Sequence, residues 1–336
     1  MSAFFHAVGD FFANLASIHW GALLIALIAF GTYLTIRSRA AFHILRAAYP
    51  NERIAFKRIW AAYIAAYGFN NVVPARGGDV VKLFLTKTSI PGASYPAVGS
   101  SFPAVAATFA VELIFDLCMA IPILAFAFTQ GAFPKPPDFS KLSAFDLAFF
   151  AGHPRFTLFL ITLLAVLGLV GFALLSRRVR AFWARVRQGF TILRDRHRYF
   201  REVWLIQLGA WGFRFVAFWF LLEAFNIGGS VKNVLLVLGV NAVAAAVPFT
   251  PGGAGVQQAF LVQVFASTAS SATVAAYSVG QQIAIGAFSL GLGFVLLATV
   301  FRFRSFKDVI AAGKADRQGA AAARATEAPA APRARA

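Results

Sequence analysis

Long apolar stretches alternate with shorter polar segments along the whole chain. A helix needs about 20 apolar residues to cross roughly 30 Å of hydrocarbon. Five stretches approach or exceed that length, at residues 20–36, 98–128, 156–175, 202–225 and 274–300. The pattern therefore predicts an all-α polytopic membrane protein with five full transmembrane helices.

Two apolar stretches are too short to cross and are interrupted in the same way. Residues 59–73 and 233–247 each lead into a proline followed by Gly-Gly, after which a second short apolar stretch begins. Irregular backbone at membrane depth is costly unless it is buried in protein or lines a wet cavity. We therefore expect two re-entrant helical hairpins, over residues 59–86 and 233–267, each entering and leaving the membrane on one side.

Composition and charge agree with a membrane protein and orient it. The chain of 336 residues is 59% hydrophobic, carries 38 phenylalanines and has a mean hydropathy of +0.71. Its net charge of +18 comes from basic residues beside the apolar stretches, where the positive-inside effect explains them better than nucleic acid does. Lys and Arg number six in residues 37–58, nine in 176–201 and eight in 301–336, against three in 129–155 and none in 1–19.

The basic segments place the protein in the cytoplasmic (inner) membrane with its N-terminus outside and its C-terminus in the cytoplasm. The two hairpins then enter from opposite sides, so the chain has the form of an inverted repeat, a known transporter design. The expected parts are an outer interfacial helix (1–19), a first repeat with the cytoplasmic-side hairpin (20–128), an outer loop with the linking span 156–175 and a basic cytoplasmic helix (129–201), a second repeat with the outer-side hairpin (202–300), and a disordered basic Ala-rich cytoplasmic tail (301–336).

The hairpin turns are candidate anion sites. Each Gly-Gly turn, Gly77-Gly78 and Gly252-Gly253, stands at the start of a returning half-helix, where free N–H groups and the positive end of the helix dipole favour an anion. Arg76 and Lys82 add cationic groups able to hold a phosphate. The alternative is that both snorkel to the cytoplasmic surface while Asp79 caps the half-helix.

Three charged residues fall near mid-membrane. Glu112 and Asp116 are four residues apart on one helical face, and Arg214 lies about twelve residues into the fourth span. Left unpaired, they would cost about 9 kcal/mol together. They form either a structural salt bridge between Glu112 and Arg214 or a charged path for a zwitterionic headgroup. Three asparagines precede the helix breaks and are expected to satisfy freed backbone groups: Asn70, Asn71 and Asn241.

Three motifs resemble one known family. They are Pro74-Ala75-Arg76-Gly77-Gly78-Asp79 with Lys82, Val111-Glu112-Leu113-Ile114-Phe115-Asp116, and the segment from Pro248 to Gly255. In content and order they resemble the signature segments of the lysylphosphatidylglycerol synthase transmembrane region, also called the flippase-like integral membrane family, over about residues 15–300. Asp79 and Lys82 stand where Glu and Arg are expected, which keeps the charges, and Gln258 stands where many members have Glu.

The resemblance implies a role in moving polar or aminoacylated lipids between leaflets. Some members also carry a soluble aminoacyl-transferase domain after the membrane part. Residues 301–336 do not supply such a domain, so we expect the membrane activity without the synthase activity.

Together these observations predict a lipid translocase or lipid-headgroup transporter, not an enzyme, with no cofactor and no metal. Its partner would be an anionic or aminoacylated phospholipid or another phosphate-bearing lipid, with a homo-oligomer or a lipid-synthesis enzyme as further partners. Two alternatives stay open: a lipid-modifying transferase using Asp79, Glu112 and Asp116 as metal-binding carboxylates, or a scaffold for lipid synthesis. The predicted substrate-binding residues are Arg76, Gly77, Gly78, Asp79, Lys82, Glu112, Asp116, Arg214, Gly252, Gly253 and Gln258.

Overall fold

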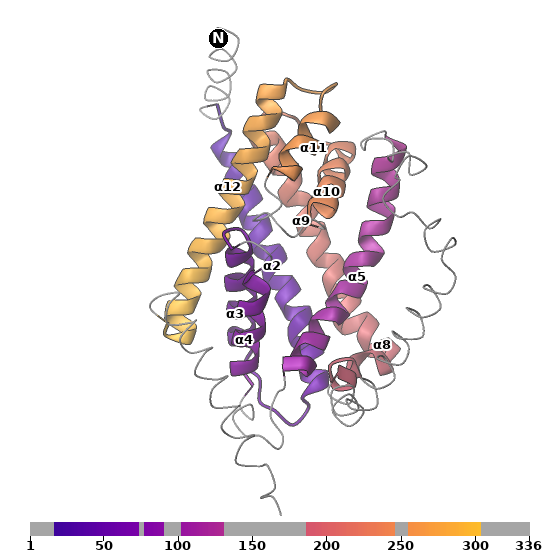
Figure 1. Ribbon diagram of the computed structural model, residues 1–336, viewed down its shortest axis with the longest axis vertical. Coiled ribbons are helices and arrows are strands. Elements are labelled where there is room, and N and C mark those ends of the chain that lie inside the picture. Colours follow the sequence, from indigo (N-terminus) through magenta and orange to yellow (C-terminus); the bar gives the residue numbers. More distant parts are fainter. Residues whose placement is uncertain (1–16, 74–76, 91–101, 131–185, 246–254, 304–336) are drawn as a thin grey trace, which may run out of the picture.

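The protein is a bundle of helices. The computed structural model describes residues 17–73, 77–90, 102–130, 186–245 and 255–303, and no β-strand occurs in them. Four helices in these ranges are long and apolar enough to cross a membrane: Trp20–Ala48, Ala104–Thr129, Arg196–Ala224 and Ser271–Phe301. They confirm an all-helical, multi-pass membrane protein (Figure 1). The predicted fifth span, 156–175, lies outside the described residues, as do most of 1–19 and 301–336.

The first long helix is longer than the sequence pattern predicts. It runs as α2 from Trp20 to Ala48, whereas the predicted span ends at residue 36, before Arg37. The helix continues because buried apolar residues recur at helical spacing beyond that arginine: Ala40, Ala41, Ile44 and Leu45. The predicted basic segment 37–58 therefore begins inside a helix, and its first basic residue is buried.

The centre of the bundle is the packing of α2 against α9 (Leu205–Ala224). Large side chains from both helices belong to one buried apolar cluster, among them Phe30 and Leu34 of α2 and Leu221 of α9. At one end, the backbone N–H of His19 donates to the carbonyl oxygen of Ala224 at 3.0 Å. At the other end, α9 is preceded directly by a π-helical turn (Phe200–Trp204) and the short α8 (Arg196–Tyr199). The two helices thus form a frame for the shorter elements.

Short helices flank both predicted breaks. α3 (Phe56–Asn70) and α4 (Gly77–Thr88) contact each other, and so do α10 (Val231–Ala245) and α11 (Val256–Val264). The two pairs lie toward opposite ends of the molecule (Figure 1). The segments that join them, residues 74–76 and 246–254, lie outside the described residues.

The α3 helix approaches α12 (Ser271–Leu296) closely because small residues meet there. A Cβ atom added to Gly68 would stand 2.7 Å from the carbonyl oxygen of Ser289, and one added to Gly293 would stand 3.0 Å from the Cα of Ala65. Small residues at such positions let two helix backbones come together, which is a common way to pack helices in membranes. The contact fixes α3, and with it one wall of the cavity described next.

Candidate functional site

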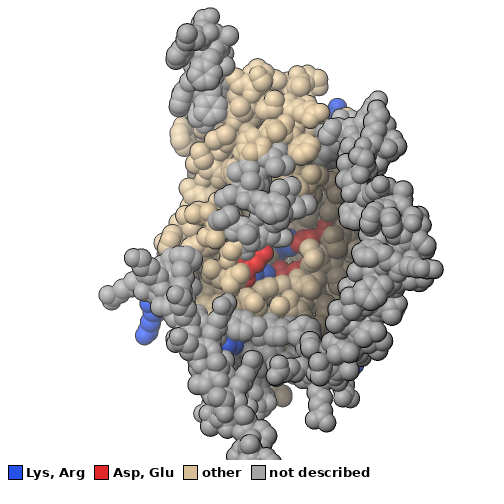
Figure 2. Space-filling view, viewed as in Figure 1, with Lys and Arg blue, Asp and Glu red and all other residues tan. Residues whose placement is uncertain are grey.

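The helices enclose a cavity of about 620 Å³ in the middle of the bundle. Figure 2 shows acidic and basic side chains gathered at the bottom of a hollow on one face of the molecule. Residues from α2, α3, α4, α5 (Phe102–Thr129), α9, α10, α11 and α12 line it. Its charged lining residues are Arg37, Asp79, Lys82, Glu112, Asp116 and Arg214. Five of these six were predicted as site residues from the sequence, and Arg37 was not.

Two ion pairs join α5 to the neighbouring helices. Lys82 of α4 places its Nζ atom 3.1 Å from Oε1 of Glu112, and these side chains are only 14% and 5% exposed. Arg37 of α2 forms an ion pair with Asp116 through its Nη2 atom. Because charges in such surroundings are costly when unpaired, these contacts explain how Glu112 and Asp116 are tolerated inside an apolar helix.

A tyrosine connects the two pairs. The Nε of Arg37 donates to the hydroxyl oxygen of Tyr63 at 2.6 Å, and this hydroxyl donates to Oε2 of Glu112 at 3.1 Å. The ammonium group of Lys82 also lies 4.2 Å from the centre of the Tyr63 ring and 4.0 Å from that of Phe109. Charged side chains of three helices and the tyrosine of a fourth, α3, therefore form one continuous network.

Arg214 stands apart from this network. Among the described residues its guanidinium contacts only aromatic rings, at 4.7 Å from the centre of Trp211, 5.7 Å from Tyr33 and 5.9 Å from Phe218. The salt bridge between Glu112 and Arg214 considered from the sequence is therefore wrong, because Glu112 pairs with Lys82 instead. A half-buried cation without a carboxylate partner can take up an anion that enters the cavity.

Asp79 lies in the first turn of α4, two residues after the helix begins at Gly77, and one of its contacts is a hydrogen bond from Nδ2 of Asn70 at 2.9 Å. Gly78 allows this arrangement, because a Cβ atom there would collide with the backbone of Ala66 and with Asn70. Gly77 likewise packs against Val73. The two glycines thus permit α4 to start directly against the end of α3.

The asparagines before the breaks differ in their roles. Asn71 donates to the backbone carbonyl of Tyr67 at 2.9 Å, as predicted. Asn70 and Asn241 instead bond to side chains, those of Asp79 and Gln257. Arg76, Gly252 and Gly253 lie outside the described residues.

In the second pair of short helices, α10 and α11, Gln257 and not Gln258 lines the cavity. Gln258 accepts a hydrogen bond from the backbone N–H of Gly255 at 2.5 Å and donates to Gln282 at 2.7 Å, so it holds the start of α11. Gln257 donates to Oδ1 of Asn241 at 2.7 Å. The sequence interpretation missed Gln257 because it followed the family position. Helical spacing alone does not tell which of two adjacent glutamines faces inward.

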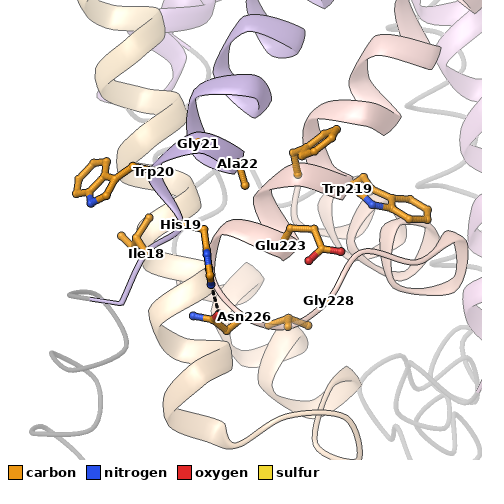
Figure 3. Close-up of a pocket in the computed structure, with 11 residues that line it drawn as sticks. Ile18, His19, Trp20, Gly21, Ala22, Trp219, Glu223, Asn226 and Gly228 are labelled. Carbon is orange, nitrogen blue, oxygen red and sulfur yellow. Dashed lines mark hydrogen bonds between the residues drawn. The ribbon is translucent and has the colours of Figure 1, made fainter.

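A second hollow, of about 910 Å³, lies at the N-terminal end of α2 (Figure 3). Three of its polar side chains, those of Glu223, His19 and Asn226, already have hydrogen-bond partners in the protein. Glu223 accepts a hydrogen bond from the backbone N–H of Gly229 at 2.9 Å, and Nε2 of His19 lies 2.8 Å from Oδ1 of Asn226. These contacts hold the loop after α9 against the start of α2, which gives the hollow a structural explanation. The central cavity is therefore the better candidate site.

Comparison with known proteins identifies the family of the chain. No curated protein and no solved structure matches the chain. One protein family does match, over residues 2–293, which is nearly the whole chain, and it is described as the lysylphosphatidylglycerol synthase TM region. The chain therefore belongs to the lysylphosphatidylglycerol synthase TM region family, which gives it a membrane function related to lipids.

Proposed function

We propose that this protein is a lipid translocase, which moves the headgroup of a phosphate-bearing polar lipid through the central cavity. The acyl chains would stay in the hydrocarbon of the membrane while the headgroup crosses. This proposal rests on the site and goes beyond what the family alone states.

The observation that carries the proposal is the state of Arg214. Arg37 and Lys82 are each bound to a carboxylate, whereas Arg214 contacts only ring faces among the residues described. A guanidinium in a low-dielectric site binds a phosphate through two parallel hydrogen bonds. The network of paired charges that lines the same cavity supplies a polar surface that is neutral overall, along which a charged group moves at lower cost than through hydrocarbon.

The wall formed by α5 supports access from the lipid. Leu113 and Leu117 both line the cavity and are 52% and 54% exposed. These two leucines belong to the exposed side of α5, whereas Glu112 belongs to its buried side. An apolar rim beside a charged interior fits a lipid, since its headgroup needs the polar surface and its chains need the apolar one.

The short helix pairs also support transport. Their positions toward opposite ends of the bundle fit two re-entrant hairpins in an inverted repeat (Figure 1). The proposed orientation in the inner membrane has the N-terminus outside and the C-terminus in the cytoplasm. In transporters of that design the substrate lies between the repeats, near mid-membrane. We include the predicted turn residues Arg76, Gly252 and Gly253 in the proposed path on the sequence argument alone.

The transferase alternative has less support. It needs Asp79, Glu112 and Asp116 as metal-binding carboxylates, but Glu112 and Asp116 are each bound by a cationic side chain. A metal ion would have to displace Lys82 and Arg37 from an aromatic and hydrogen-bonded setting. The scaffold alternative gives no reason for a polar cavity inside the bundle.

The test is reconstitution of the purified protein in liposomes that contain an acyl-labelled phosphatidylglycerol in one leaflet. A translocase redistributes the label between leaflets and leaves the lipid chemically unchanged. A chemically new lipid, formed with a metal ion or an activated donor, would identify a transferase. If the label is not redistributed and no new lipid forms, the translocase and transferase hypotheses are both excluded and the scaffold hypothesis remains.

A further inference from the structure

The cavity wall formed by α10, α11 and α12 presents side-chain amides, and none of its described lining residues is charged. Gln281 of α12 lines the cavity and is only 1% exposed, and neither its Nε2 nor its Oε1 atom has a hydrogen-bond partner among the described residues. A buried amide without partners costs free energy, so its retention at a cavity wall points to a partner that enters the cavity.

Further unused polar atoms line the same cavity. The bond between Gln257 and Asn241 uses Nε2 of the first and Oδ1 of the second, and leaves Oε1 and Nδ2 without a partner in the described ranges. The indole N–H of Trp211 is likewise buried and unpartnered in that part of the chain. The set therefore contains both donors and acceptors.

This mixture selects among possible headgroups. A hydroxyl both donates and accepts, so neighbouring hydroxyls can satisfy amide N–H and C=O groups together. An ammonium group only donates and would leave the N–H groups of Gln281, Asn241 and Trp211 unpaired. A carboxylate or phosphate only accepts and would leave the amide oxygens unpaired.

We propose that the amide-bearing wall formed by α10, α11 and α12 is a subsite for an uncharged, hydroxyl-rich headgroup unit, and that Gln281 is a specificity-determining residue of that subsite. The substrate class is then a phospholipid whose phosphate carries a polyol or sugar, in preference to one that carries an amine. This inference rests on the proposed translocation of phosphate-bearing lipids, with the phosphate at Arg214.

The test measures binding of three lipids with identical acyl chains to the purified protein in detergent, by native mass spectrometry or by the lipid-induced rise in melting temperature. Phosphatidylinositol carries phosphate and a ring of hydroxyls, phosphatidic acid carries phosphate alone, and phosphatidylethanolamine carries an ammonium group. We expect phosphatidylinositol to bind on the order of tenfold more tightly than either of the others, because it alone satisfies the amides.

Gln281→Leu, with the nearly isosteric Gln281→Met as a second variant, should reduce phosphatidylinositol binding to the level of phosphatidic acid. The chain offers a matched control in Gln207 of α9, which is 0% exposed with both amide atoms unpartnered among the described residues, but does not line the cavity. Gln207→Leu should leave the lipid preference unchanged.

Two results would overturn the subsite and leave the proposed translocation intact. One is the absence of a preference for phosphatidylinositol, as expected if the amides bind only water. The other is a preference that persists in both Gln281 variants. Arg214→Gln separates this failure from that of the proposed function. Phosphatidic acid binding that is indifferent to Arg214→Gln would overturn the phosphate site and this inference together. Arg214-dependent binding without an effect of Gln281 would overturn the subsite alone.

Discussion

Arg37 and Asp116 are 79 residues apart in the sequence and form an ion pair at the centre of the bundle. The pair joins α2 to α5. The α2 helix packs extensively against α9, and the outer face of α5 carries exposed leucines. Both residues line the central cavity. The pair therefore fixes the wall of the proposed headgroup path as well as the packing of two long helices.

The first prediction concerns the strength of this pair. Arg37→Met or Asp116→Leu alone should lower the free energy of unfolding by about 3 kcal/mol, because the first leaves the half-buried Asp116, and the second the buried Arg37, without its ionic partner. The double variant should lose much less than the sum, which thermal unfolding in detergent measures. The pair between Arg198 and Glu202, at 3.0 Å with side chains 41% and 34% exposed, is the control and should show a coupling of roughly 0.5 kcal/mol or less. Additive losses at Arg37 and Asp116 would contradict the pairing.

The second prediction concerns the hydroxyl that links the two pairs. Tyr63→Phe should destabilise the protein by about 1 to 3 kcal/mol, since Arg37 Nε and Glu112 both lose a partner. Tyr277→Phe is the matched control, because the Tyr277 hydroxyl is buried without a partner among the described residues. Its removal should be neutral or stabilising. Equal melting temperatures for the two variants would argue against a linking role for Tyr63.

A third prediction concerns the close contact between α3 and α12. Gly68→Ala should cost about 1 to 3 kcal/mol, because the added methyl group meets backbone atoms of Ser289 and Leu290 that cannot move aside easily. Gly291→Ala in α12 has nothing within 4 Å of the new methyl group and should stabilise its helix by up to about 1 kcal/mol. Melting temperatures that move in the same direction for both variants would be inconsistent with the described contact.

The fourth prediction concerns orientation in the membrane. Cysteines introduced at the exposed positions Arg194 and Lys232, in a Cys118→Ala background, lie before and after α9. The charge distribution predicts that a membrane-impermeant thiol reagent added to intact cells labels Lys232→Cys and not Arg194→Cys. The reverse pattern of labelling would invert the proposed topology and with it the sides from which the hairpins enter.

Much of the fold follows from hydrophobic length alone. Four of the five long apolar stretches are long helices in the described residues, and short helices flank the Pro/Gly-Gly breaks, because both features depend on local composition. The end of α2 was predicted too early, since a rule that stops a span at the first arginine ignores a buried partner. Tyr33 and Arg37 stand four residues apart, and buried alanines follow, so a longer helical window would have shown the continuation.

The site was predictable by residue type and not by pairing. Glu112, Asp116, Lys82 and Arg214 all line one cavity, as charged residues inside apolar helices are expected to do. Which cation pairs with which carboxylate depends on how α2, α4 and α9 pack around α5. The local sequence of each helix does not predict that packing. The same holds for Gln281, whose proposed role rests on two atoms that have no hydrogen-bond partner among the described residues.

The most direct test of the central claim is the rate of lipid redistribution by Arg214 variants in liposomes. If Arg214 holds the headgroup phosphate, Arg214→Gln should slow the movement of acyl-labelled phosphatidylglycerol on the order of tenfold, and Arg214→Lys should restore only part of the rate. Both variants should keep a melting temperature near that of the unmodified protein, because Arg214 contacts only rings among the described residues. An unchanged rate in Arg214→Gln, or a loss of rate matched by a loss of thermal stability, would contradict passage of the headgroup through this cavity.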